Sequence, residues 1–260
     1  MADVSASVAR SFGRAASSYD AACQVQPLAA SRLLQRLLPY QPQARLALDL
    51  GCATAPAAAR LAQAFPAARF VGVDIALPML QQARALARCH ADYLPLCADA
   101  CCLPFASGSI DLIFSSFALQ WTPPAVALAE SRRVLAAGGI LALSVPVAGS
   151  LAEIGASWAE VDADAHVNRL ASVDEWLAAV AATDWRVQAQ ADWQWREWAP
   201  DAMTQLTRIK ASGAQLRLQQ PPGLASRQRL AAFMAAYEKQ RTDAGLPLTW
   251  QVLELVLKKA

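Results

Sequence analysis

Two acidic residues follow short apolar segments in the first third of the chain. Asp49 stands just before a turn of small side chains at residues 51–55 (sequence GCATA), and Asp74 ends the apolar segment 70–74. Small side chains let the backbone N–H groups of such a turn approach a ligand closely. A helix that starts near residue 56 would direct its own N-terminal N–H groups at the same place. This arrangement is typical of a nucleoside-binding site at the carboxyl ends of parallel strands, in which Asp74 accepts both ribose hydroxyls.

Further polar residues follow the next predicted strands in the same order. Asp99 and Ala100 come after the third strand, where they would face an adenine amine, and residues 115–121 after the fourth strand would line the reacting side. The turn lacks the G-x-G-x-x-G spacing that a nicotinamide dinucleotide needs, so another nucleoside is favoured. The predicted nucleoside contacts are Asp49, Gly51, Cys52, Ala53, Asp74, Ile75, Met79, Asp99, Ala100, Ser115 and Gln120.

The elements that position these residues alternate between strand and helix. Apolar segments predict strands at 46–50, 70–74, 93–97, 109–116 and 140–145. Helical patterns lie between them, including 78–88 and 125–135, and a glycine-containing turn at 136–139 closes the last of these helices. Such alternation predicts an α/β fold with a doubly wound, mostly parallel sheet that carries helices on both faces.

The remaining segments frame this core. We expect a helical N-terminal segment (1–42), a nucleoside-binding core (43–147) and a substrate-binding part (148–260) that also contributes closing strands, for seven strands in all. In that last part the pattern predicts helices at 151–165, 173–182, 200–212 and 226–241, a loop at 216–223, and strands at 185–198 and 248–257. Phe12 and Tyr19 in the first segment either anchor a helix on the core or belong to a lid over the nucleoside.

Composition narrows the possible classes of protein. The 260 residues are 55% hydrophobic and 17% charged, which is typical of a globular protein with a sizeable core, and the net charge of +2 argues against nucleic-acid or membrane binding. We expect a cytoplasmic protein, by default, and a monomer. The chain shows no apolar segment of a length that spans a membrane and no secretory leader. A cluster of thiols with one histidine lacks the paired C-x-x-C spacing of a metal site, so we expect buried reduced thiols and no metal; its members are Cys89, His90, Cys97, Cys101 and Cys102.

Five short motifs of the core fall in a recognisable order. They are D-L-G-C at 49–52, V-G-V-D at 71–74, A-D-A at 98–100, I-D-L-I at 110–113 and L-A-A-G-G at 135–139. In this order they resemble the class I S-adenosylmethionine-dependent methyltransferases, a family with a Rossmann-like fold. The resemblance implies S-adenosyl-L-methionine as the cofactor.

Motifs outside the core extend the resemblance over nearly the whole chain. They are F-G-R-A-A-x-x-Y-D at 12–20, A-L-Q-W at 118–121, V-A-G-S-L at 147–151, H-V-N-R-L at 166–170, I-K-A-S-G-A at 209–214 and L-P-L-T-W at 246–250. These segments resemble the malonyl-carrier-protein O-methyltransferases of biotin synthesis. The resemblance implies methylation of the free carboxylate of a malonyl group carried by acyl carrier protein, or by coenzyme A. The alternatives are a methyltransferase for another small acceptor, such as a quinone or a sterol-like ring, and a non-catalytic nucleoside-binding regulator.

The glycine turn departs from the family pattern G-C-G-T-G. Ala53 and Ala55 replace the second and third glycines. Alanine is tolerated at Ala53 if its φ stays negative, and we therefore expect cofactor binding to survive. At Ala55 the replacement of glycine bears more on the geometry with which the chain enters the following helix.

An ionised carboxylate needs orientation and exclusion of water more than it needs a general base. The groups expected to hold it are Arg169 in the matched H-V-N-R-L segment, Tyr19, and with less support Arg14 and Lys210. Trp121 is expected to border the methyl group beside Gln120, although core packing would explain it equally, and His166 fits either a helix end or the site. We therefore take Tyr19, Arg169 and Trp121 as the catalytic candidates.

An acidic carrier protein would dock on a basic surface. The local excess of basic residues lies in the C-terminal part and comprises Arg208, Lys210, Arg217, Arg227 and Arg229. A run of charges is equally often just a solvated face.

Overall fold

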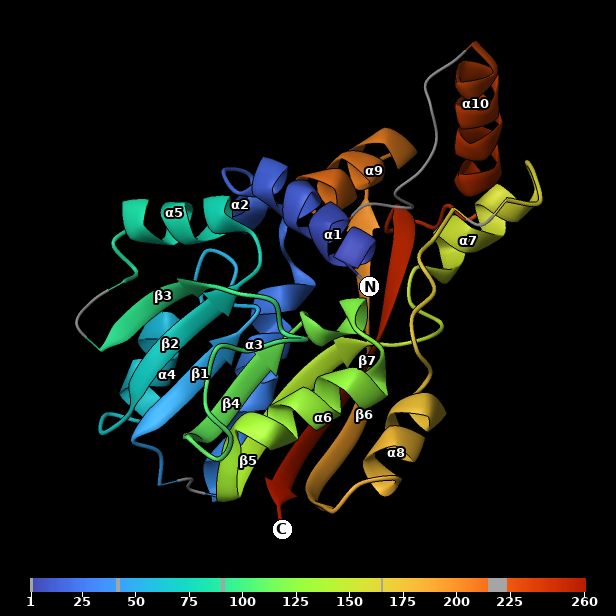
Figure 1. The fold of residues 1–260 in the computed structure, drawn as a ribbon. Helices are drawn as coiled ribbons and strands as arrows, with labels where there is room; N and C mark the ends of the chain where they lie inside the picture. The colour runs from blue at the N-terminus through green and yellow to red at the C-terminus, as the bar shows by residue number, and fades with distance from the viewer. Residues whose placement is uncertain (1, 41–42, 90–91, 165, 215–223) are drawn as a thin grey trace.

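The computed structural model describes residues 2–40, 43–89, 92–164, 166–214 and 224–260. The expected loop at 216–223, together with Arg217 and His90, lies outside them. One seven-stranded sheet runs through the described chain in the order β3-β2-β1-β4-β5-β7-β6 (Figure 1). Its strands are β1 (Leu46–Leu50), β2 (Arg69–Asp74), β3 (Tyr93–Cys97), β4 (Ile110–Ser116), β5 (Leu135–Pro146), β6 (Trp185–Ala199) and β7 (Leu246–Lys259).

The first five strands pair in parallel, and β7 pairs antiparallel with both β5 and β6. The prediction of a doubly wound, mostly parallel seven-stranded sheet is therefore confirmed. The strand expected at 185–198 is one long strand, β6, which pairs with β7 along most of its length.

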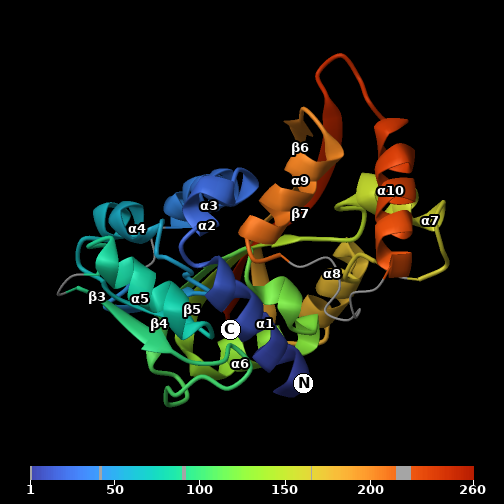
Figure 2. The ribbon, with the colours of Figure 1, turned by 90° about the horizontal axis from the view of Figure 1, so that it is seen from above.

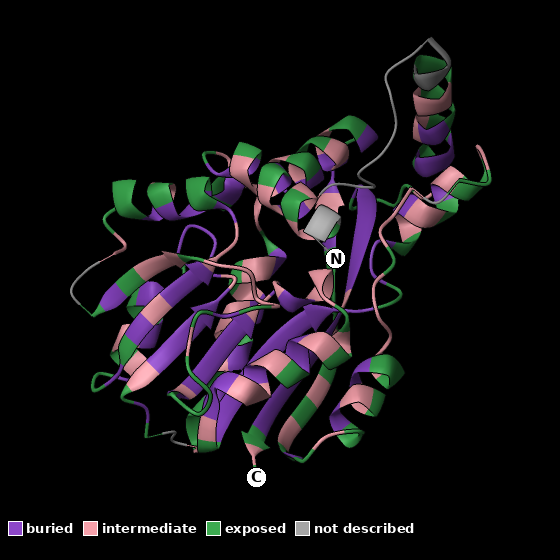
Figure 3. Cartoon of the chain, in the orientation of Figure 1, coloured by how far each residue is buried: buried purple, intermediate pink, exposed green. Residues whose placement is uncertain are grey.

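Alternation along the strands divides the core between the two faces of the sheet. Leu48 and Leu50 of β1 belong to the cluster under α6 (Pro124–Val134) and α8 (Val173–Ala181). Ala47, which points to the opposite face, belongs to the cluster under α3 (Val25–Leu37) and α4 (Ala58–Ala64). The strands at the centre of the sheet are buried along most of their length, as Figure 3 shows, and they carry mainly apolar residues, as strands covered on both faces do.

The expected turn at 136–139 is instead part of a strand. Helix α6 ends at Val134 and β5 begins at the next residue. Gly138 has a φ of 75°, and the pairing with β4 shifts register between Ile110 and Leu112. The glycines therefore accommodate an irregularity at the start of β5, because they accept backbone angles that other residues avoid.

The helix expected at 151–165 is shorter, since α7 spans only Ala152–Ala159. The chain then turns, and the N–H of Asp162 donates to the carbonyl of Trp158. α7 packs against α10 (Leu224–Glu238) at the end of the antiparallel β6–β7 pair that lies farther from the sheet's parallel half (Figures 1 and 2).

The N-terminal helices lie over the carboxyl ends of the parallel strands. α1 (Ala2–Ala15) packs against α5 (Leu77–Ala85), and α2 (Tyr19–Ala22) contacts α9 (Ala202–Ala211). The Ser11 hydroxyl donates to the Gly213 carbonyl at 2.9 Å, and the Ser18 hydroxyl donates to the Ala211 carbonyl at 3.0 Å. Early and late parts of the chain therefore meet above the sheet (Figure 2). Within the described residues, no helix has the length and apolarity that crossing a membrane requires.

Candidate active site

Asp74 ties the turn after β1 to the end of β2. Its Oδ2 accepts the backbone N–H of Ala53 at 2.8 Å, and its Oδ1 accepts that of Ala76 at 2.8 Å. The carbonyl of Val73 receives the N–H groups of Gly51 and Cys52 at 2.7 and 3.0 Å. Burial raises the pKa of Asp74, and the N–H donors oppose that rise. Each carboxylate oxygen keeps a lone pair for a further donor, such as a ribose hydroxyl.

The turn is left-handed at three positions. Gly51 has a φ of 75°, and a Cβ there would lie 2.0 Å from the Cβ of Ala118, so only glycine fits. Ala53 and Ala55 have φ values of 48° and 57°. The expected negative φ at Ala53 is therefore wrong. The two alanines that stand in place of glycines still adopt the left-handed backbone that suits glycine, and the strain costs about 1–2 kcal/mol for each residue. Helix α4 then begins at Ala58, two residues later than expected.

A first cavity with about 680 Å³ of empty space lies at this turn. Six of the predicted nucleoside contacts line it: Gly51, Ala53, Asp74, Ile75, Asp99 and Ala100. Burial tends to raise the pKa of Asp99, but hydrogen bonds from the Cys101 backbone and the Ser5 side chain outweigh it and the pKa is lowered. An ionised carboxylate, a second buried carboxylate and small apolar walls suit an adenosyl group, whose amine and ribose hydroxyls are donors.

Five other predicted contacts do not line the first cavity; four of them lie behind the turn, and the fifth, Gln120, lines the second cavity described below. The side chain of Asp49 is buried and accepts the Tyr93 hydroxyl at 2.7 Å; burial raises its pKa to about 7. The Ser115 hydroxyl donates to the Leu50 carbonyl at 2.9 Å, and Met79 is fully buried in the core. Cys52 lines a separate cavity together with Asp49 and Gly51. These four residues therefore can support the turn from the side that faces away from the first cavity.

Helix α1 forms one wall of the first cavity, and the sequence analysis did not include its residues among the nucleoside contacts. Ser5, Val8 and Phe12 all line it. Their spacing of three and four residues places them on one helical face, which is a pattern that a search for amphipathic helices could have found. The lid interpretation of this segment agrees with that position, since α1 lies over the strand ends (Figure 1).

A second cavity, with about 570 Å³ of empty space, adjoins the first. Phe12, Tyr19, Phe117 and Trp121 line both cavities, so they form the boundary between them. The ring of Trp121 meets that of Phe12 edge-on, with centroids 5.7 Å apart. Two of the three catalytic candidates, Tyr19 and Trp121, thus lie where a cofactor and an acceptor would meet.

The second cavity is apolar and uncharged. Among the described residues that line it there is no arginine, lysine, histidine or acidic residue; besides the four shared ones they include Gln26, Gln120, Asn168, Ser212 and Trp250. Gln120, which we expected at the cofactor, therefore lies on the other side of the Trp121 boundary. Burial raises the pKa of Tyr19 well above its usual range, so its hydroxyl stays a neutral donor.

Arg169 lies outside both cavities. Its guanidinium pairs with Glu175 at 2.6 Å, and its side chain is 77% exposed. It lines an outer groove whose other walls include Gln120 and Trp121. The hydrogen bond also holds the pKa of Glu175 below its usual value. The other basic candidates lie on α1, which carries Arg14, and α9, which carries the exposed Lys210.

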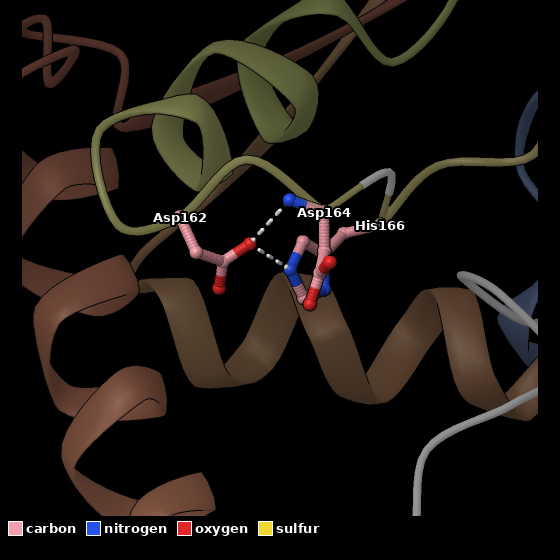
Figure 4. A group of neighbouring side chains, drawn as sticks. All are labelled: Asp162, Asp164 and His166. Atoms are coloured by element: carbon pink, nitrogen blue, oxygen red, sulfur yellow. Dashed lines mark hydrogen bonds and ion pairs between the residues drawn. The ribbon is translucent and has the colours of Figure 1, made fainter.

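His166 belongs to an ion-paired cluster between α7 and α10 (Figure 4). Its Nε2 lies 2.7 Å from Asp162 Oδ1, and its ring stacks on Trp158 with centroids 3.8 Å apart. The Asp162, Asp164 and His166 atoms are close enough for a metal ion. However, Arg229 already donates to both carboxylates. The cluster therefore joins the segment that follows α7 to α10, and His166 lies in that segment, neither at a helix end nor on the lining of either cavity.

The thiols are more exposed than we expected. Cys97 and Cys102 are exposed and only Cys52 is buried, so the expectation of uniformly buried thiols is wrong. Cys97 ends the short edge strand β3, and Cys102 lies in the loop after it, where side chains are left uncovered.

Known proteins share both the core and the flanking segments of this chain. The methyltransferase domain family matches residues 48–143. A malonyl-[acyl-carrier protein] O-methyltransferase of Alcanivorax borkumensis is 43% identical over 97% of this chain and 86% of that protein. The chain belongs to the malonyl-[acyl-carrier protein] O-methyltransferase family. The resemblance found in the flanking motifs is thereby confirmed.

Solved structures agree on the fold. The YcgJ protein of Bacillus subtilis aligns with a TM-score of 0.57 at 18% identity, over 88% of this chain and 98% of that one. A geranyl diphosphate C-methyltransferase of Streptomyces coelicolor, solved with S-adenosyl-L-homocysteine, aligns with a TM-score of 0.54 at 15% identity, over 88% and 79% of the two chains. These likenesses confirm a class I methyltransferase fold for this member of the family.

Proposed function

We propose that this chain uses S-adenosyl-L-methionine to methylate the free carboxylate of a malonyl thioester, with malonyl-acyl carrier protein as its acceptor in biotin synthesis. The single observation that carries the proposal is the pair of adjoining cavities that share Tyr19 and Trp121. The family name supports the acceptor, since the Alcanivorax relative is named for malonyl-acyl carrier protein.

The first cavity holds the cofactor in this proposal. Asp74 accepts the ribose hydroxyls, Asp99 faces the adenine amine, and the turn at Gly51 and Ala53 approaches with its backbone. Ile75 and Ala100 supply the apolar walls. Asp49, Cys52, Met79 and Ser115 act by supporting the turn and the adjoining strand ends. When bound, S-adenosyl-L-methionine supplies an electrophilic methyl group, which ends on a carboxylate oxygen as a methyl ester.

Tyr19 and Trp121 orient the acceptor. The Tyr19 hydroxyl and the Trp121 indole N–H are neutral donors at the boundary, and neutral donors hold a carboxylate without withdrawing as much electron density as a cation does. No proton has to move, because a malonyl carboxylate is already ionised at neutral pH. Phe12 and Phe117 exclude water from the boundary, which strengthens these contacts.

The basic residues of this proposal lie outside the two cavities. Arg169 at the outer groove remains our candidate for a clamp on the carboxylate. For carrier docking, two members of the proposed basic surface are exposed, Lys210 and Arg227. Arg208 instead donates to the Trp198 carbonyl at 2.9 Å, and Arg229 pairs with Asp162. We propose that Lys210 and Arg227 meet the acidic carrier, so that kcat/KM for the carrier substrate falls as salt rises.

The test is an acceptor assay. The protein is incubated with methyl-labelled S-adenosyl-L-methionine and malonyl-acyl carrier protein, and a base-labile methyl ester on the carrier is the expected product. Bound S-adenosyl-L-methionine with no ester would overturn the acceptor, and labelling of a quinone instead would support the alternative acceptor class.

A further inference from the structure

Ten buried side-chain polar atoms lack a hydrogen-bond partner among the described residues, and three of them belong to residues that line the second cavity. These three are Oε1 of Gln26, Oε1 of Gln120 and Nε1 of Trp121. A buried polar group without a partner costs about 1–3 kcal/mol. Native proteins keep few such groups, and three around one cavity indicate a ligand that supplies their partners.

The chemistry of these atoms specifies that ligand. The Trp121 Nε1 is a donor, whereas the two glutamine Oε1 atoms are acceptors. The orientation of the Gln120 amide is fixed, because its Nε2 donates to the Phe117 carbonyl at 2.9 Å. A malonate group has only acceptor oxygens at neutral pH. It can pair with the indole N–H but with neither glutamine oxygen, so the ligand must carry an N–H donor as well.

We infer that Gln26 and Gln120 bind the first amide N–H of a pantetheine-type thioester, and thereby select acceptors whose malonyl group is carried on that arm. This inference rests on the proposed function and extends it to the thioester arm. In such an acceptor, the carboxyl carbon and the first amide nitrogen are six bonds apart, which spans roughly 7 Å when extended, as two residues of chain do. The carboxylate can then lie at Tyr19 while the N–H reaches the glutamine side of the cavity.

The absence of charge among the described lining residues supports the same ligand. An amide is neutral, so the glutamine side of the cavity can take it without an ionised partner, whereas the malonyl carboxylate lies at the Tyr19 and Trp121 donors on the boundary. A site built around a hydrogen bond rejects an analogue that lacks the donor, because its own acceptor is then left buried and unpaired. Gln26 and Gln120 are specificity-determining residues in this proposal, and they take no part in the chemical step.

The experiment compares two acceptors that differ in one group. Malonyl-N-acetylcysteamine thioester carries the N–H, and the malonyl thioester of 2-mercaptoethyl acetate replaces that N–H by an ester oxygen. We expect kcat/KM to favour the amide at least tenfold in the unaltered protein. Gln26→Met and Gln120→Met should each reduce that ratio to below threefold. Gln194→Met, on the exposed part of β6, is the matched control and should leave the ratio unchanged.

The ratio separates specificity from general damage, since loss of packing or of the Phe117 contact slows both acceptors alike. Equal use of both acceptors by the unaltered protein would overturn the inference while leaving the proposed function intact. A preference for the amide that survives in both glutamine variants would also overturn it, because another group would then contact the N–H. Failure to methylate either thioester, and malonyl-acyl carrier protein as well, would instead count against the proposed function.

Discussion

A Cβ at Gly51 would lie 2.0 Å from the Cβ of Ala118, which brings the turn after β1 against the chain that follows β4. This approach closes one end of the first cavity, since both residues line it. Two features therefore require glycine at position 51: its backbone is left-handed, and the space beside it is too small for a methyl group.

Gly51→Ala should weaken cofactor binding, because the turn must move to relieve the collision. We expect at least a tenfold rise in Kd for S-adenosylhomocysteine by calorimetry, and a destabilisation of about 2–3 kcal/mol, as overpacking produces. Gly108→Ala separates the two features, because Gly108 also has a positive φ, but a Cβ there would meet no atom within 4 Å. That control should show only the backbone cost, about 1 kcal/mol. Equal losses in both variants would remove the steric argument.

Asp74→Asn should weaken cofactor binding about ten- to a hundredfold. The amide keeps one acceptor oxygen, but it loses the second and the charge, each of which strengthens hydrogen bonds by about 1–3 kcal/mol. Calorimetric titration with S-adenosyl-L-methionine measures the change. Asp111→Asn, on the far end of β4, is the control for a carboxylate that also accepts backbone N–H groups. Unchanged affinity in Asp74→Asn would mean that the nucleoside binds elsewhere.

Ala55→Gly should leave the free energy of unfolding unchanged or raise it. Glycine removes about 1–2 kcal/mol of left-handed strain, which offsets the lost methyl group and the added flexibility of the unfolded chain. Ala58→Gly, at a buried position with helical geometry three residues later, should lose about 1 kcal/mol. Urea unfolding of both variants makes the comparison, and equal destabilisation would show that Ala55 carries no strain.

Asp49 should make stability depend on pH. Burial raises its pKa to about 7 in the folded protein, whereas the unfolded chain keeps a value of about 4. Between these values the folded protein binds more protons, so its stability falls as pH rises. An asparagine side chain cannot titrate, so Asp49→Asn should gain at least about 1.4 kcal/mol relative to the unaltered protein between pH 5 and pH 8. Urea unfolding at both pH values measures this gain, and a constant difference across that range would refute the shift.

Arg169→Ala should raise KM for the malonyl acceptor about tenfold and leave the affinity for S-adenosyl-L-methionine unchanged, since the side chain lies outside the first cavity. Glu175→Ala is the matched control, because it releases the guanidinium from its ion pair without removing it. Turnover that persists unchanged in Arg169→Ala would eliminate the proposed clamp and leave the carboxylate to Tyr19 and Trp121.

The order of motifs along the chain was enough to predict the sheet and six of the residues that line the first cavity. Local patterns identify strand ends, and parallel topology brings Gly51, Asp74 and Asp99 together. The backbone angles of Ala53 and Ala55 were not predictable, because alanine by itself favours negative φ. The turn is instead held by the hydrogen bonds that its backbone N–H groups donate to the Val73 carbonyl and the Asp74 carboxylate.

The second cavity was only partly predictable for another reason. Trp121 and Gln120 follow a strand and were found from their position, but Gln26 and Trp250 reach the cavity from distant elements. No local pattern specifies such an approach, since it depends on how α3, which carries Gln26, packs against β7, which carries Trp250. Arg169 shows the converse, because a matched motif placed it near the site without determining which partner its side chain meets.

The hydrogen bond from Ser11 to Gly213 joins residues 202 positions apart. When only β1 to β5 have been synthesised, the chain contains the nucleoside turn with Asp74 and Asp99. It does not yet contain Gly213, which accepts the hydrogen bond from Ser11 of α1, or Trp250, which lines the second cavity. A nascent chain at that stage can therefore present a cofactor site without a place for its acceptor. In the proposed reaction, methyl transfer also needs Trp250 of β7, which lines the second cavity, so this step requires β7 to be in place.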